Sequence, residues 1–155
     1  MQLRLGARRA TVGLAVVAAV ACGPGTPPPA ALDTRNDACA HCRMMVSSQR
    51  FAAQIVAPSE EPKFFDDVGC LREYLQQRPD LAAGTTAYVA DHRTGEWVAA
   101  DHAVFTHTQR VQTPMASGVI AHDSVSSRDR DGAAAGGENV AAANILGPLM
   151  TRGQR

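Results

Sequence analysis

Aromatic residues are scarce in this 155-residue chain. Its one Trp, two Tyr and four Phe all lie between Phe51 and Phe105, so a large core spread along the whole length is not expected. An excess of charge is also lacking, because 15 basic and 15 acidic residues balance. No basic run extends beyond Arg8–Arg9. Nucleic-acid binding, which leaves a basic patch or stripe in a sequence, is therefore not indicated.

The patterns that accompany common enzyme chemistry are missing as well. No Ser/His/Asp order, no pair of carboxylates placed around a water site and no glycine-rich phosphate loop stands out. Those patterns carry acyl transfer, glycoside hydrolysis and phosphoryl transfer. We therefore expect no catalytic turnover.

The start of the chain has the composition of an export signal. Three arginines lie within the first nine residues, and the apolar run Val12–Ala21 follows. That run is about half of the roughly 20 residues that a membrane-spanning helix needs, so it predicts a signal peptide at residues 1–21. The small residues Ala19–Ala21 lead directly into Cys22, which resembles a bacterial lipobox and predicts lipidation of Cys22. An ordinary cleaved signal with an incidental Cys22 is the alternative.

A proline-rich segment follows the predicted lipidation site. Gly23–Asn36 carries four prolines in fourteen residues. Such a segment is unsuited to a helix or a central strand, so residues 22–36 are predicted to form a semi-extended tether. The tether would attach the folded part to a membrane without crossing it.

Residues 37–122 are predicted to form the folded domain. Apolar positions recur at helical spacing over residues 67–78, Asp66 and Asp67 are placed to cap this helix, and Pro79 stops it. Strand composition is found at residues 50–56, 85–90, 96–99, 103–105 and, weakly, 119–120. The sum predicts an α+β fold with a small, mainly antiparallel sheet and at least one helix.

The last 33 residues, 123–155, differ in composition from the predicted folded domain. They hold no aromatic residue, a charged stretch at Arg128–Asp131 and an Ala/Gly run at Gly132–Gly137. This composition predicts a low-complexity tail that is disordered or loosely docked. Ile145, Leu146, Leu149 and Met150 are the residues through which it can dock.

Cys39 and Cys42 form a Cys-x-x-Cys motif. In the oxidising compartment that exported proteins meet, such a pair can form a disulfide or a redox couple, and it can also supply half of a zinc site. No second Cys-x-x-Cys is present. A complete zinc site would require the fold to bring distant histidines to this cysteine pair. The five histidines are spread along the sequence: His41, His92, His102, His107 and His122.

Met44 adds a soft donor next to this motif. A neutral thioether together with a thiolate favours Cu(I) over Zn(II). In an extended segment, the side chains of Cys42 and Met44 would point to the same face. Packing of Met44 in the core beside a structural cysteine pair is the alternative. Met115 lies in the turn-forming stretch Thr113–Gly118, an unusual place for a core methionine.

Cys70 stands at the start of the predicted helix. Its simplest interpretation is a small buried side chain that packs near Tyr74.

Several of these motifs resemble one known family when taken in order. The resemblance covers about residues 37–122 and is to the NosL family, lipoproteins associated with the maturation of nitrous oxide reductase. The segments that carry it are Cys39–Met44, Arg50–Gln54, Phe65–Leu71, Glu96–Ala100 and Thr113–Ala121.

Membership in this family would imply a periplasm-facing, lipid-anchored Cu(I)-binding protein. Its role would be to deliver copper to the apparatus that assembles the multicopper sulfide centre of nitrous oxide reductase. The implied fold is two small ββαβ-like units similar to a part of organomercurial lyase. The weak apolar pattern of Ser124–Ala135 leaves the completeness of the second unit open.

The resemblance also implies a ligand set. The family's metal ligands fall on Cys42, Met44 and Met115, with Cys39 as a second thiol that can bind or exchange. His41 is a possible nitrogen donor, or it is simply solvated. Two positions depart from the family pattern: Arg43 and Ala116 stand where NosL proteins commonly have Gly.

Two other functions stay open at this point. The first is a thiol–disulfide oxidoreductase that uses Cys39 and Cys42, although the motif does not follow a strand and open a helix as in thioredoxin-like proteins. The second is a structural lipoprotein stapled by zinc or by a disulfide.

Overall fold

The computed structural model describes residues 26–150 apart from Pro79 and Pro148. The predicted signal peptide and Cys22 lie outside the described residues. Over the part of the chain that the structure describes, no helix has the length and apolar character needed to cross a membrane.

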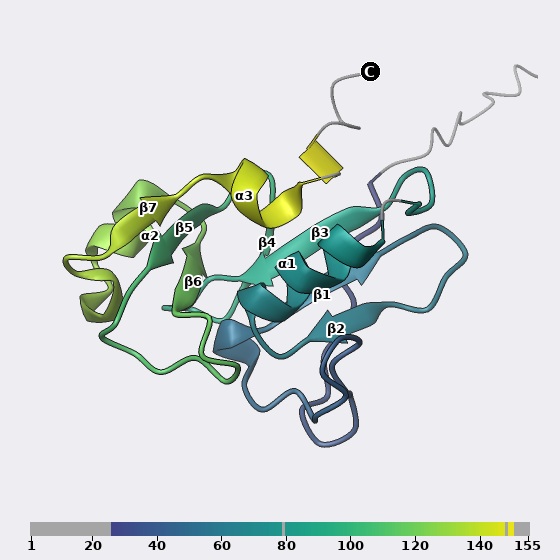
Figure 1. Cartoon of the computed structure of the whole chain (residues 1–155), viewed down its shortest axis with the longest axis horizontal. Helices are drawn as coiled ribbons and strands as arrows, with labels where there is room; N and C mark the ends of the chain where they lie inside the picture. The colour runs from purple at the N-terminus through teal and green to yellow at the C-terminus, as the bar shows by residue number, and fades with distance from the viewer. Residues whose placement is uncertain (1–25, 79, 148, 151–155) are drawn as a thin grey trace, which may run out of the picture.

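A four-stranded antiparallel sheet forms the first half of the domain. After the short 3-10 helix η1 (Gln49–Phe51), its strand order is β2-β1-β3-β4. The elements are β1 (Ala53–Val56), β2 (Lys63–Phe65), β3 (Thr86–Ala90) and β4 (Trp97–Ala99). Helix α1 (Val68–Gln77) lies across one face of this sheet (Figure 1).

The side chains on that face form the core. Successive residues of a strand point to opposite faces, and Ile55 and Phe65, both almost fully buried, belong to the same core cluster as the α1 residues Leu71 and Leu75. The rings of Phe65 and Tyr74 lie 5.1 Å apart, which fixes α1 against the end of β2.

The opposite face of the sheet is covered by the proline-rich segment. Gln54 is fully buried, and its side-chain amide both accepts from the Ala30 amide and donates to the Ala30 carbonyl, at 2.7 and 3.1 Å. The Tyr88 hydroxyl donates to the carbonyl of Pro27 at 2.6 Å. The part of the predicted tether from Pro27 to Ala30 is therefore bound to the sheet, because two buried polar side chains find their backbone partners there.

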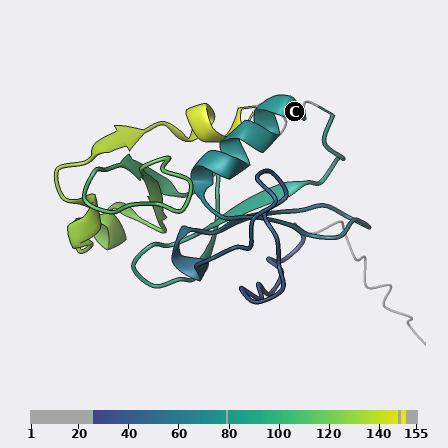
Figure 2. The same cartoon turned by 60° about the horizontal axis from the view of Figure 1, so that its bottom comes forward.

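A three-stranded antiparallel sheet forms the second half, with the order β6-β5-β7. Its strands are β5 (Val104–His107), β6 (Val119–His122) and β7 (Glu138–Val140), and α2 (Val125–Asp129) and η2 (Gly132–Ala134) connect β6 to β7. The final helix, α3 (Ala142–Leu146), lies beside α1 on the same side of the molecule (Figure 2).

The prediction of a disordered or loosely docked tail does not agree with residues 124–146. Strand β7 pairs with β5 in the register Phe105↔Val140, and Ile145 and Leu146 are 1% and 2% exposed in the core beside α1. Composition missed this because one hydrogen-bonded strand and two apolar side chains suffice to fix a segment to an existing core.

Both halves have the order strand, strand, helix, strand: β1-β2-α1-β3 and β5-β6-α2-β7. The predicted α+β class with two ββαβ-like units is therefore confirmed, and the second unit is complete. The similarity to organomercurial lyase stays a prediction.

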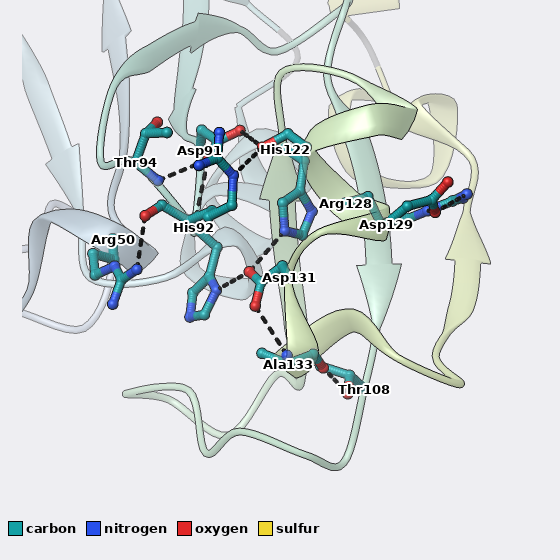
Figure 3. Close-up of polar contacts among 12 residues, drawn as sticks. Arg50, Asp91, His92, Thr94, Thr108, His122, Arg128, Asp129, Asp131 and Ala133 are labelled. Carbon is teal, nitrogen blue, oxygen red and sulfur yellow. Dashed lines mark hydrogen bonds and ion pairs between the residues drawn. The ribbon is translucent and has the colours of Figure 1, made fainter.

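Asp91, directly after β3, joins the two halves (Figure 3). It forms a bridge with Ala121 of β6, and its fully buried carboxylate accepts four hydrogen bonds. Oδ1 accepts from the amides of Arg93 and Thr94, and Oδ2 accepts from the amide of Asp123 and the hydroxyl of Ser127. Burial alone would raise the pKa of Asp91, but these hydrogen bonds outweigh it and hold the pKa below its ordinary value.

We predict that Asp91→Asn lowers the free energy of unfolding by roughly 2–4 kcal/mol, because an amide group cannot accept from all four donors. Urea denaturation measures the loss. The matched control is Asp101→Asn, at a carboxyl that is 56% exposed, which should change stability by less than about 0.5 kcal/mol.

The lowered pKa of Asp91 also makes the stability of the fold depend on pH. The contribution of Asp91 to the free energy of unfolding is complete above the pKa of the unfolded carboxyl, near 3.9, and is lost as the pH falls below that value. The Asp91→Asn protein should therefore lose less stability than the wild type between about pH 5 and about pH 3. Parallel losses in the two proteins would contradict this assignment.

Candidate metal centre

A tight turn holds the first two cysteines. Residues 37–46, here called the cysteine loop, are closed by hydrogen bonds from the Val46 amide to the Asp37 carbonyl and from the Cys39 amide to the Met44 carbonyl, at 2.9 and 2.8 Å. The Arg43 amide donates back to the Cys39 carbonyl at 3.0 Å. The chain therefore turns between Cys42 and Met44, and the same-face argument for an extended segment does not apply to them.

The loop is anchored to the sheet at both ends. The Ala40 amide donates to the carbonyl of Phe64 in β2 at 2.8 Å. At the other end, Asp66 accepts from the backbone amide and the hydroxyl of Ser47 through a single carboxylate oxygen. Asp66, predicted from sequence to cap the helix, thus fixes the cysteine loop instead.

Asp67 is the residue that caps α1. Its Oδ1 accepts from the amide of Cys70 at 3.0 Å. Its Oδ2 accepts from the Thr113 hydroxyl and the Met115 amide, both at 3.0 Å. One buried carboxylate therefore places Cys70 and the loop at residues 113–118, here called the methionine loop, at the same end of α1.

Close packing of the methionine loop on α1 depends on a glycine. A Cβ atom at Gly69 would lie 2.6 Å from the Cβ of Ser117, which is closer than two carbons can approach. The absence of a side chain at position 69 lets the two segments meet.

Three thiols converge where these segments meet. The Sγ atoms of Cys39, Cys42 and Cys70 all lie within 4.8 Å of one another, and all three cysteines are free. Cys39 and Cys70 are buried, at 1% and 3% exposure, whereas Cys42 is half-buried. Sequence reasoning missed Cys70 because only the fold brings the start of α1 to the cysteine loop. The Asp-Asp-x-Gly-Cys segment was the available signal.

The thiols differ in acidity. A hydrogen bond from the Cys70 thiol, helped by the Cys42 amide 3.5 Å from Sγ of Cys39, holds the pKa of Cys39 below its ordinary value although burial works against it. The same hydrogen bond and burial raise the pKa of Cys70, and burial raises the pKa of Cys42. A thiolate therefore forms first at Cys39, and a metal ion that binds the other sulfurs must displace their protons.

The two predicted methionine ligands are partly exposed, and their backbones are bonded to residues near the thiols. Met44 is 49% exposed and Met115 is 38% exposed. The backbone of Met44 is bonded to Cys39, and that of Met115 is bonded to the carboxylate that caps α1 at Cys70. Their role as ligands stays a prediction, as does that of Cys42 and Cys39.

The arrangement suits binding of a soft ion better than thioredoxin-like chemistry. Cys39 and Cys42 lie in a turn, and α1, which contributes Cys70, begins at Val68. Thiolate and thioether sulfurs select Cu(I) and, for thiolates, Zn(II). The three thiols thus fit a soft metal ion. The thioether of Met44 belongs to the second residue after Cys42 in the sequence.

Comparison with protein families agrees with this centre. The NosL family model matches residues 29–148. The chain belongs to the NosL family. Membership makes it a copper-related accessory protein of nitrous oxide reductase. The match extends past residue 122, the predicted end of the folded domain, and includes β7 and α3. Comparisons with curated proteins and with solved structures give no match.

The two departures from the family pattern have a structural consequence. Arg43 and Ala116, which replace common NosL glycines, both have positive φ, at 69° and 56°. This left-handed conformation is costly for residues with a Cβ atom and free for glycine. The turns of both loops are therefore kept in this chain, with some backbone strain.

We predict that Ala116→Gly raises the free energy of unfolding by roughly 0.5–1 kcal/mol, because it relieves the strain at the methionine loop. The matched control is Ala135→Gly, at φ −62°, which should lower stability by a similar amount. Urea denaturation of both variants tests the difference. Destabilisation by both substitutions would show that Ala116 is not strained.

Proposed function

We propose that this NosL protein is a Cu(I) carrier, anchored to a membrane through lipid on Cys22 and facing the periplasm. It would deliver copper for assembly of the multicopper sulfide centre of nitrous oxide reductase, with that enzyme or its maturation apparatus as partner. The proposal is supported by the three thiols that meet between the cysteine loop and α1, and by the Asp67 carboxylate that binds the backbone of both Cys70 and Met115.

Cys42, Met44 and Met115 are the proposed ligands. All three side chains are at least partly accessible, whereas Cys39 and Cys70 are buried behind them. A carrier must hold its ion and also let another protein's ligands reach it, and accessible donors meet the second requirement. Cys39 is the reserve ligand, because its lowered pKa makes its thiolate available near the site.

Transfer in this scheme is a ligand exchange and not a redox step. Copper stays Cu(I), and an incoming soft ligand replaces one thioether at a time. Thioethers need no proton on release, so loss of Met44 or Met115 leaves no buried charge. The Cys42 thiolate takes up one proton when the ion leaves, as its raised pKa favours.

A zinc-holding thiol cluster is the second candidate. The observation that favours it is the grouping of three free thiols within 4.8 Å, two of them buried as in structural zinc sites. In that case Cys70 is a ligand and the methionines are not.

The decisive variants are Met44→Leu/Met115→Leu and Met45→Leu, prepared in the soluble form that begins at Gly23. We expect the double variant to weaken Cu(I) binding at least about tenfold, the equivalent of about 1.4 kcal/mol. Leucine nearly conserves the volume of methionine, so folding should be little affected. Anaerobic titration against a Cu(I) chelator measures the affinity.

Met45→Leu is the matched control, since Met45 is the chain neighbour of Met44 and is 45% exposed. It should bind Cu(I) as the wild type does. Unchanged affinity in the double variant would refute the proposed ligand set. If Cys70→Ser then weakened binding, and Zn(II) outcompeted Cu(I), the three-thiol zinc cluster would replace it.

Gly69→Ala tests whether the two loops must meet. The added Cβ would clash with Ser117, displace the methionine loop from α1, and lower Cu(I) affinity together with stability by about 1–3 kcal/mol. Gly132→Ala is the control, because a Cβ there meets nothing within 4 Å. The same chelator competition, with urea denaturation in parallel, compares the variants. Unchanged Cu(I) affinity in Gly69→Ala would separate the methionine loop from the copper site.

A further inference from the structure

A second group of metal-ligating side chains shares no residue with the thiol cluster. His92 follows β3, His122 ends β6, and Asp131 caps η2. Nδ1 of His92 is 2.6 Å and Nε2 of His122 is 2.9 Å from the same Asp131 oxygen, Oδ2 (Figure 3). One ligand atom from each residue lies within 4.8 Å of the other two.

These three side chains are removed from water. His122 is fully buried, His92 is 7% exposed, and the Asp131 side chain is 11% exposed. Burial by itself raises the pKa of Asp131, but the hydrogen bonds from His92 and His122 outweigh it and lower the pKa to about 2. The only ion-pair partners of Asp131 among the described residues are the two imidazoles, which carry charge only if protonated.

The surroundings hold each ligand in place. Oδ1 of Asp131 accepts from the amide of Ala133, which leaves Oδ2 for the cluster. The His92 amide donates to the carbonyl of Ala121, and its ring packs against Phe51 at 5.0 Å. Such outer contacts are what orient the ligands in protein metal sites.

The free ring nitrogen of His122 is the second, independent observation. Nδ1 of His122 and Oγ1 of Thr106 are buried atoms without a hydrogen-bond partner among the described residues. Val104 pairs with His122 and Thr106 with Ile120, so Thr106 and His122 are neighbours on one face of the second sheet. When Nε2 binds a cation, the ring proton must lie on Nδ1, and no described residue donates a hydrogen bond to that nitrogen.

Of the three side chains, Asp131 lies nearest to solvent. Asp131 borders a solvent-open hollow of about 450 Å³ that is lined further by Arg128, Ala134 and Gly137 among others. Zinc bonds to imidazole nitrogen and carboxylate oxygen are about 2.0–2.2 Å long, which places tetrahedral ligand atoms about 3.4 Å apart. The observed separations of 2.6 and 2.9 Å need to widen by less than about 1 Å.

We propose that His92, His122 and Asp131 bind Zn(II), at a site separate from the sulfur centre. Two imidazoles and one carboxylate suit this borderline ion and offer nothing soft to Cu(I). The bound ion would join the end of β3 to β6 and η2, and so fasten the two ββαβ units to each other. The chain supplies three ligands, so a fourth would come from solvent.

The test uses Zn(II) and its spectroscopic substitute Co(II) on the soluble form that begins at Gly23. We expect one equivalent of Co(II) with visible d–d bands and without sulfur-to-cobalt charge transfer. That binding should persist in Cys39→Ser/Cys42→Ser/Cys70→Ser. Zn(II) should shift the ring-nitrogen resonances of His92 and His122 in the wild type and leave those of His102, which is 80% exposed, in place.

Substitutions measure how much each side chain contributes to Zn(II) affinity. Asp131→Asn keeps the shape of the side chain and should weaken Zn(II) binding at least about tenfold, whereas His102→Gln should not change it. Zn(II) should raise the urea midpoint of the wild type and not that of Asp131→Asn. If Asp131→Asn does not fold, the wild-type resonances decide. Zn(II) that leaves the His92 and His122 resonances unmoved, or Co(II) that shows only sulfur charge transfer, would overturn the proposal without touching the copper assignment.

Discussion

The Asp67 carboxylate is the interaction on which the sulfur centre depends. One oxygen caps α1 at Cys70, and the other holds the methionine loop through Thr113 and Met115. These hydrogen bonds join two segments that are far apart in sequence through one buried side chain. Its neighbour Asp66 does the same for the cysteine loop through Ser47. Adjacent acidic residues thus assemble a site in which neither is a proposed ligand.

Two other acidic side chains help to hold the two halves of the domain together. Asp91 accepts from two donors across the junction between β3 and β6, Asp123 and Ser127, and Asp131 accepts from both buried histidines. The two halves also share one apolar core, in which Phe105 of β5 and Ile145 of α3 belong to the same cluster as Leu71 of α1.

Local pattern predicted most of the first unit. The spacing of Val68, Leu71 and Leu75 sets α1, and strand composition around Ile55 sets β1. The short strand β7 could not be read from its own residues, because it is stabilised by pairing with β5. Cys70 and the pairing of His92 with His122 were missed for the same reason. Each depends on contacts between residues at least 28 positions apart, which no local window contains.

The docking of Pro27 and Ala30 beneath the sheet has a consequence for reach. If Cys22 carries lipid, only the residues from Cys22 to Pro27 separate the bilayer surface from a fixed point on the domain. An extended chain of that length spans no more than about 18 Å. The domain would then stay close to the membrane, with the sheet face that carries Gln54 and Tyr88 near the headgroups. It would meet its partner by lateral diffusion in the membrane, because the short tether limits how far the domain can move away from the bilayer.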